Sequence, residues 1–95
     1  MYYFANFYGG MIMSRTKVNE KVVITAIGFR KNLVAYPRRM EFRGATYNFI
    51  DAGLRCLVRY SDYIAEIITM SDGVSYYFLR SDNRGGNWTL LSIES

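Results

Sequence analysis

The chain has 95 residues, of which 51% are hydrophobic and 17% aromatic, and its formal net charge is +4. This length predicts a single domain with a small core, and the aromatic content is not that of a disordered chain. The mild positive charge permits an anionic partner without requiring one. The absence of histidine removes the commonest general base and the commonest transition-metal ligand.

Residues 1–20 are aromatic and then polar, and we interpret them as a loosely attached or interface-forming arm that precedes a domain over residues 21–95. The candidate interaction residues of this arm are aromatic: Tyr2, Tyr3, Phe4, Phe7 and Tyr8. A cluster of this kind favours burial against the domain or against a second chain. Alternatively, Met11 or Met13 is the true start, and the segment before it is not part of the native protein.

The chain shows no export signal and no long apolar run. The arm lacks a basic leading region, and its apolar stretch is short for a signal peptide. Cys56 is the single cysteine, so an internal disulfide cannot form. These features predict a protein of the reducing cytoplasm.

Strands are predicted from Lys21 onward. Residues 22–29 are rich in β-branched side chains, and Pro37 marks an edge or the start of a strand. Residues 38–50 give the clearest hairpin, because apolar Met40 and Phe42 alternate with charged residues up to a turn at Gly44.

The second half of the chain continues this pattern. Residues 54–58 alternate, residues 63–70 form an apolar run, and Asp72-Gly73 suits a tight hairpin turn before further strands at 74–80 and 88–93. A short helix within 52–68 is the alternative for the middle segment, with Asp51 as its N-cap. We expect an all-β fold of five to seven short strands, forming a small antiparallel barrel or a strongly curled sheet. An SH3-like barrel is the first choice.

No motif predicts catalysis, so we expect a non-enzymatic protein without cofactor or metal. Cys56 is predicted to point into the core with Leu54 and Val58, where no histidine activates it. Trp88 is expected to anchor the core. The four aspartates, half of the eight acidic residues, fall at predicted turns. Glu66 either faces solvent or pairs with an arginine across the sheet.

The arginines are the most suggestive group. The alternation predicts that Arg39 and Arg43 face outward from one strand, and that Arg55 and Arg59 face outward from another. If these strands are neighbours, they share one face with nearby cations and tyrosines. The candidate nucleic-acid-binding residues are Tyr36, Arg38, Arg39, Arg43, Arg55 and Arg59. Small barrels bind single strands with such basic grooves and aromatic platforms, although charge on a wet sheet face is also ordinary.

Residues 36–47 have the pattern Tyr-Pro-Arg-x-apolar-x-aromatic-x-Gly-x-x-Tyr. The pattern resembles the opening of certain short, uncharacterised bacterial β-rich domains, and the resemblance extends over residues 33–95 at most. It implies further strands up to a final apolar strand, but it implies no activity and no site residues.

Two functions therefore stay open for a non-catalytic binding module. The first is nucleic-acid binding through the arginine and tyrosine face. The second is protein interaction or homo-oligomeric assembly, for which the aromatic arm and the small core argue. Neither function involves a membrane.

Overall fold

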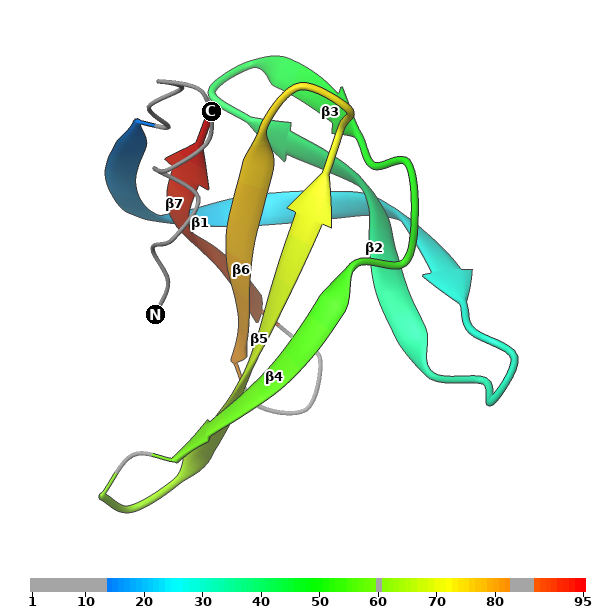
Figure 1. The fold of residues 1–95 in the computed structure, drawn as a ribbon, viewed down its shortest axis with the longest axis vertical. Coiled ribbons are helices and arrows are strands. Elements are labelled where there is room, and N and C mark those ends of the chain that lie inside the picture. The colour runs from blue at the N-terminus through cyan, green and yellow to red at the C-terminus, as the bar shows by residue number, and fades with distance from the viewer. Residues whose placement is uncertain (1–13, 60, 83–86) are drawn as a thin grey trace, which may run out of the picture.

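The computed structural model describes residues 14–59, 61–82 and 87–95, and all its regular structure is β (Figure 1). Seven strands form one antiparallel sheet in the order β3-β2-β1-β7-β6-β5-β4. The strands are β1 (Arg15–Phe29), β2 (Ala35–Phe42), β3 (Ala45–Asn48), β4 (Leu54–Arg59), β5 (Ile64–Ser71), β6 (Tyr76–Asp82) and β7 (Asn87–Glu94). The all-β prediction is confirmed. The helix alternative within 52–68 is wrong, because β4 and β5 cover that segment.

Strand β1 belongs to both halves of the sheet. Its residues 15–22 pair with β7, and its residues 23–29 pair with β2. The register shifts after Lys17 and again around Ala26, and Asn19 has a φ of 53°. Extra residues of this kind bend a strand and increase its twist. The strand also begins at Arg15 rather than near Lys21, so the sheet includes the C-terminal part of the expected arm.

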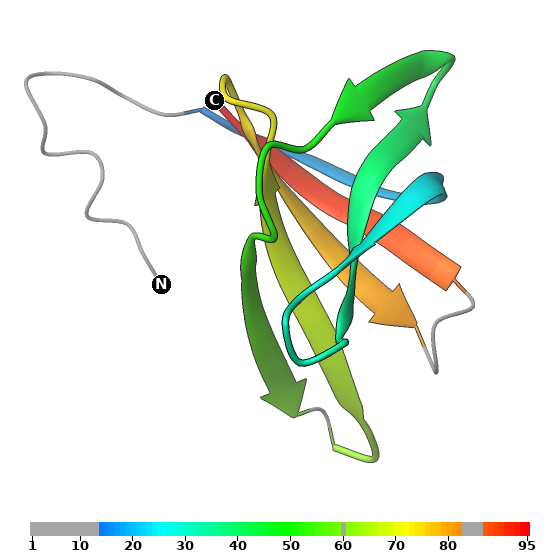
Figure 2. The ribbon, with the colours of Figure 1, turned by 90° about the vertical axis from the view of Figure 1, so that its right-hand side faces the viewer.

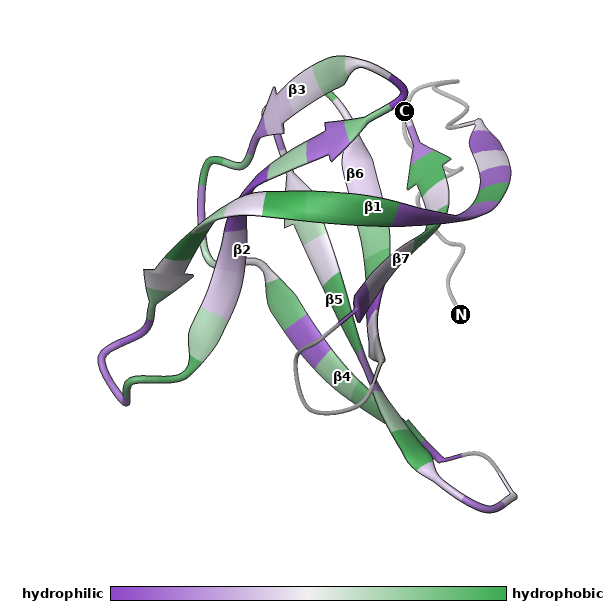
Figure 3. Ribbon diagram, turned by 180° about the vertical axis from the view of Figure 1, so that it is seen from behind, coloured by the Kyte–Doolittle hydropathy of each residue, from purple (hydrophilic) through white to green (hydrophobic). Residues whose placement is uncertain are grey.

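These bends fold the sheet over onto one core (Figure 2). The core residues come from both halves: Met40, Phe42, Phe49, Ile68, Met70, Tyr77, Leu79 and Leu90. Trp88 packs against this cluster as expected. Figure 3 shows hydrophobic residues along the middle of β1 and along most of β4 and β5.

The sheet is curled but not closed, because its end strands β3 and β4 do not pair with each other. The barrel prediction is therefore wrong in its closure, and the curled-sheet alternative is correct. β3 has only four residues and ends at Asn48. The chain then crosses to β4 through residues 49–53, where the amide of Gly53 donates to Asp51 Oδ1 over 2.9 Å.

The positions of the two predicted hairpin turns are confirmed, although the second is a four-residue loop, 72–75, and not a tight turn. Arg43 and Gly44 join β2 to β3 with φ values of 51° and 78°, the left-handed pair that suits the twist of a two-residue hairpin. Asp72 and Gly73 lie in the turn from β5 to β6, where Gly73 has a φ of 95°. In β2, Met40 and Phe42 are buried while Glu41 is exposed, as the alternation predicts.

Candidate functional site: the free edge of strand β4

Two arginines span the open side of the sheet between β2 and β4. Arg30, from the loop after β1, donates through Nη2 to the carbonyls of Ala52 at 2.9 Å and Gly53 at 3.0 Å. Arg55, on β4, forms an ion pair with Glu66 and donates to the carbonyl of Ala35 at 2.7 Å. β4 is an end strand of the sheet, so its outer edge has no paired strand beside it. At the start of that edge, the Gly53 carbonyl already accepts a hydrogen bond from Arg30.

The hydrogen bonds around β5 show which main-chain groups of β4 face this free edge. Ile50 N donates to Ser71 O over 2.8 Å, so the odd-numbered residues of β5 direct their groups away from β6 and towards β4. Ile67 and Thr69 lie opposite Cys56 and Leu54 in an unbroken register. Residues 54, 56 and 58 therefore bond to β5, whereas residues 55, 57 and 59 direct their N–H and C=O groups outward.

Exposed apolar side chains flank this edge. Leu54 is 76% exposed and Leu57 is 69% exposed, and Cys56 between them is also exposed. Isolated exposed leucines are ordinary, but Leu54 and Leu57 lie on the two faces of one edge strand, where an added segment would contact both.

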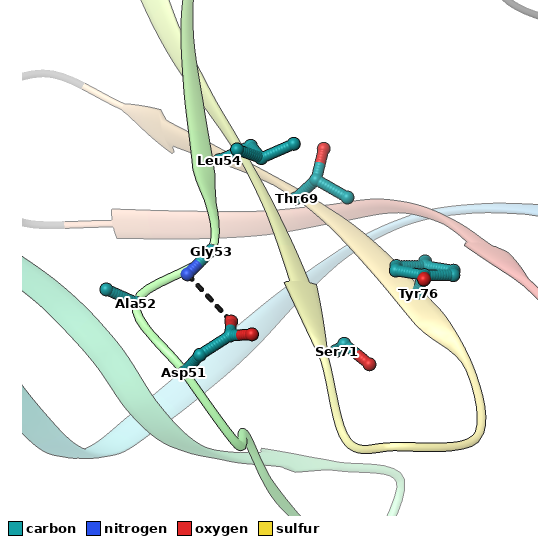
Figure 4. A pocket seen from close by; sticks show the side chains of 7 residues that line it. All are labelled: Asp51, Ala52, Gly53, Leu54, Thr69, Ser71 and Tyr76. Carbon is teal, nitrogen blue, oxygen red and sulfur yellow. Dashed lines mark hydrogen bonds between the residues drawn. The ribbon is translucent and has the colours of Figure 1, made fainter.

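Leu54 also separates two shallow hollows. One has a volume of about 270 Å³ and is lined by Asp51, Ala52, Gly53, Leu54, Thr69, Ser71 and Tyr76 (Figure 4). The other has a volume of about 310 Å³ and lies on the side of the β1–β2 loop, lined by Arg30, Asn32, Val34, Gly53, Leu54 and Arg55. The first hollow lies on the β5 and β6 side of Leu54, and the second lies on the outer side of β4, where it leaves room for a side chain of an added segment.

The other edge of the sheet, β3, is less suited to pairing. β3 has four residues where β4 has six, and short edge strands are a usual protection against unwanted pairing. β4 contains no proline, glycine or lysine, and its pairing with β5 shows no bulge. Arg55 and Arg59 share the face of Ile68; Arg55 is paired with Glu66, and Arg59 is exposed at the end of the strand.

The prediction of a shared arginine face depends on the condition that its two strands are neighbours in the sheet, and that condition is not met. β2 and β4 are not paired, because β4 is an end strand and pairs with β5. Arg39 donates to Thr25 Oγ1 at 2.9 Å, and Arg43 pairs with Glu20 and lies over the Phe42 ring.

The remaining candidate residues are also spread over the fold. Arg55 is half-buried, and it shares a face with the fully buried Ile68 opposite it, so its predicted outward orientation is wrong. Arg38 and Arg59 are exposed on different strands. Tyr36 is half-buried and covers Gly28, where an added Cβ would lie 2.5 Å from the tyrosine Cζ.

The predicted inward position of Cys56 is wrong as well. Cross-strand partners share a face, and Cys56 lies opposite Ile67, on the face away from the core residue Ile68. Leu54 and Cys56 are exposed and Val58 is half-buried. Sequence reasoning therefore missed Leu54 and Leu57 as surface residues. The signal was present in the apolar residues on both alternating faces of 54–58.

The displaced pKa values have local structural causes. Burial alone raises the pKa of Asp72, but hydrogen bonds from Ser75 N, Tyr77 Oη and Val74 N outweigh it and lower that pKa below its usual value. Burial, followed by the bond to Asp72, raises the pKa of Tyr77. Glu20 raises the pKa of Arg43 through a hydrogen bond at the surface. These groups stabilise a turn and a strand pair, and they do not form an acid–base pair in a cleft.

Within the described residues, no cluster of three or more histidine, cysteine, aspartate or glutamate side chains is arranged to hold a metal ion. The same part of the chain contains no helix long and apolar enough to cross a membrane. The predicted arm residues Tyr2, Tyr3, Phe4, Phe7 and Tyr8 lie outside the described residues.

Comparison with known proteins gives no relative. No protein-family model, no curated protein and no solved structure matches the chain. The resemblance of residues 36–47 to short bacterial domains therefore stays a prediction.

Proposed function

We propose that the protein is a non-catalytic interaction module that adds an extended segment of a partner polypeptide to the free edge of β4. The observation that carries this proposal is the row of outward main-chain groups at Arg55, Leu57 and Arg59 in a strand that pairs on one side only. Main-chain hydrogen bonds along such an edge supply affinity, and pockets for alternate side chains supply specificity.

The chemistry of the edge indicates an extended, largely apolar segment. Leu54 and Leu57 offer apolar contacts on opposite faces of β4. The hollow between Leu54 and the β1–β2 loop leaves room for a side chain of the added strand. The charge of Arg55 is already neutralised by Glu66, so an acidic partner is not required there.

Nucleic-acid binding, the other function that the sequence suggested, has less support. Arg39, Arg43 and Arg55 are each held by acceptors within the protein, and phosphate would have to compete with those acceptors. The predicted arginine face also requires the strands of Arg39 and Arg55 to be neighbours, and the sheet does not pair them. The SH3-like relationship likewise stays a prediction, and the interaction proposal does not depend on it.

Leu57→Pro tests the proposal directly. The Leu57 amide faces outward, so proline removes an edge donor while the ladder to β5 keeps its hydrogen bonds. Thr46→Pro is the matched control on β3. Phe49 N donates to Arg38 O over 2.9 Å, so by alternation the Thr46 amide also faces away from its partner strand. Circular dichroism and thermal unfolding show whether both variants keep the fold.

Short random peptides are selected against the wild-type protein, and binding of the recovered peptides is measured by isothermal titration. We expect Thr46→Pro to bind like the wild type and Leu57→Pro to bind about tenfold more weakly, the equivalent of roughly 1.4 kcal/mol. Peptides that bind Leu57→Pro as tightly as the wild type would place the binding surface elsewhere and refute the proposal.

A further inference from the structure

We propose that the segment added to the β4 edge is β4 of a second copy of this chain, in an antiparallel pair with a two-fold axis at Cys56. This inference rests on the proposed function, because it uses the same edge. A two-fold interface joins one surface to itself, so the strand must be complementary to its own reverse. The side chains and main-chain directions of β4 show whether the strand is complementary to its own reverse.

The side chains of β4 favour one register. Opposite residues of an antiparallel pair share a face, so a symmetric pair must be centred on a residue rather than between two residues. The registers that use most of β4 are centred on Cys56 or Leu57. Centring on Leu57 places Arg55 opposite Arg59 of the second copy, and does so twice, which like-charge repulsion disfavours.

Centring on Cys56 avoids that repulsion. Leu54 then lies opposite Val58 of the second copy, and Arg55 lies opposite Leu57 of the second copy. The exposed Leu54 gains an apolar neighbour across the new pair. The small, uncharged Cys56 lies at the axis, where two copies of the same side chain must fit together.

The main-chain directions suit the same register. Arg55 and Leu57 both face their N–H and C=O groups outward, as the pairing with β5 requires. Arg55 of one copy and Leu57 of the other can therefore exchange hydrogen bonds in both directions, and symmetry repeats the exchange. The N–H and C=O groups of Cys56 face β5, so the two Cys56 residues of the dimer would form a non-hydrogen-bonded pair with Cα atoms about 4.5 Å apart. That separation lies within the range that a disulfide spans.

A second copy is favoured as the occupant for two reasons. Symmetric pairing satisfies the edge groups of both copies at once, and the ion pair of Arg55 with Glu66 leaves no uncompensated charge at the centre of the contact. A chain of this length also buries a limited core on its own and gains from burying further apolar surface.

The test uses the full chain, whose single cysteine is Cys56. Sedimentation equilibrium under reducing conditions measures the dimer, and mild copper-catalysed oxidation followed by mass spectrometry measures the Cys56–Cys56 disulfide. We expect a reversible dimer that oxidation locks, with Thr46→Pro unchanged and Leu57→Pro dissociating about tenfold more readily. In Cys56→Ser with Leu57→Cys, which moves the thiol by one residue, locking should be about tenfold slower than in the wild type.

A second variant, on the exposed face of β4, keeps the dimer testable if Leu57→Pro does not fold. Cys56→Arg places like charges together at the axis, so it should weaken the dimer and regain part of it at high salt. A monomer at every concentration, with recovered peptides still binding the β4 edge, overturns the second-copy inference and leaves the proposed function standing. A dimer that persists unchanged in Leu57→Pro overturns the second-copy inference. Faster disulfide formation through the cysteine at position 57 than through Cys56 overturns the proposed register. If Leu57→Pro changes neither dimer nor peptide binding, both proposals fail.

Discussion

Gly53 sets the position where β4 leaves the crossing segment, and its replacement by alanine should be costly. Its φ is +69°, and a Cβ there would lie 2.4 Å from the Thr69 carbonyl oxygen and 2.5 Å from Met70 Sδ. The methionine side chain can move, but the carbonyl belongs to the β5 main chain. Alanine therefore forces β4 away from β5 at the first residue of the edge strand.

The expected cost has two parts. A left-handed backbone costs a residue with a Cβ about 1–2 kcal/mol, and overpacking against a fixed neighbour costs about 1–3 kcal/mol more. Gly44→Ala isolates the first part. Gly44 has a φ of +78°, but a Cβ there would meet nothing within 4 Å. Both variants change the unfolded chain alike, so their difference measures the steric part alone.

Urea unfolding of the wild type and both variants provides the assay. We expect Gly44→Ala to lose about 1 kcal/mol and Gly53→Ala to lose about 1–3 kcal/mol more than that, with similar m-values. Equal losses in the two variants would refute the reasoning, because they would show that the Thr69 carbonyl does not confine this position.

Three further variants test the core, the turn and the ion pair. Ile68→Ala removes most of a fully buried side chain and should lower the free energy of unfolding in urea by about 2–5 kcal/mol. A loss near zero would show that Ile68 is not packed in the core. The folded-state pKa of Asp72 is lowered, so its stabilisation is present above the unfolded pKa of about 4 and disappears as pH falls through the folded value. Wild-type stability should therefore fall more steeply in acid than that of Asp72→Asn, and identical pH profiles would exclude this linkage. Arg55→Met leaves Glu66 without its partner and should cost about 1–3 kcal/mol. Adding Glu66→Met should recover part of that loss, and simple additivity in the double variant would show that the ion pair is not coupled.

The parts of the fold that the sequence predicts correctly are local. The hairpin at 38–50 alternates strictly, and its turn residue Gly44 has the backbone that the turn needs. The Asp72 turn is equally local, because its hydrogen bonds come from residues two to five positions away. Periodicity and turn chemistry depend on residues within such short segments, so these elements can be predicted from the sequence without knowledge of the partner strands.

The start of β1 could not be predicted in the same way. Residues 15–20 are mostly polar, and the sequence predicts an arm for them. In the structure they pair with β7, where Arg15 lies opposite Glu94 and Thr16 opposite Ile93. That register brings together the two ends of the described chain. Nothing in the local pattern of residues 15–20 indicates a partner so distant in the sequence.

The arginine face failed for a related reason that also explains the free edge. In β4 both alternating sets contain apolar residues, so periodicity alone does not decide which set faces inward. Glu66 on β5 decides it, because Arg55 reaches that carboxylate only from the face shared with Ile68. The choice turns Leu54 and Cys56 outward. An unpaired inward charge normally guards an edge strand against pairing, but the ion pair with Glu66 neutralises this one. The contact that holds Arg55 within the protein therefore also leaves no unpaired charge at that position of the β4 edge.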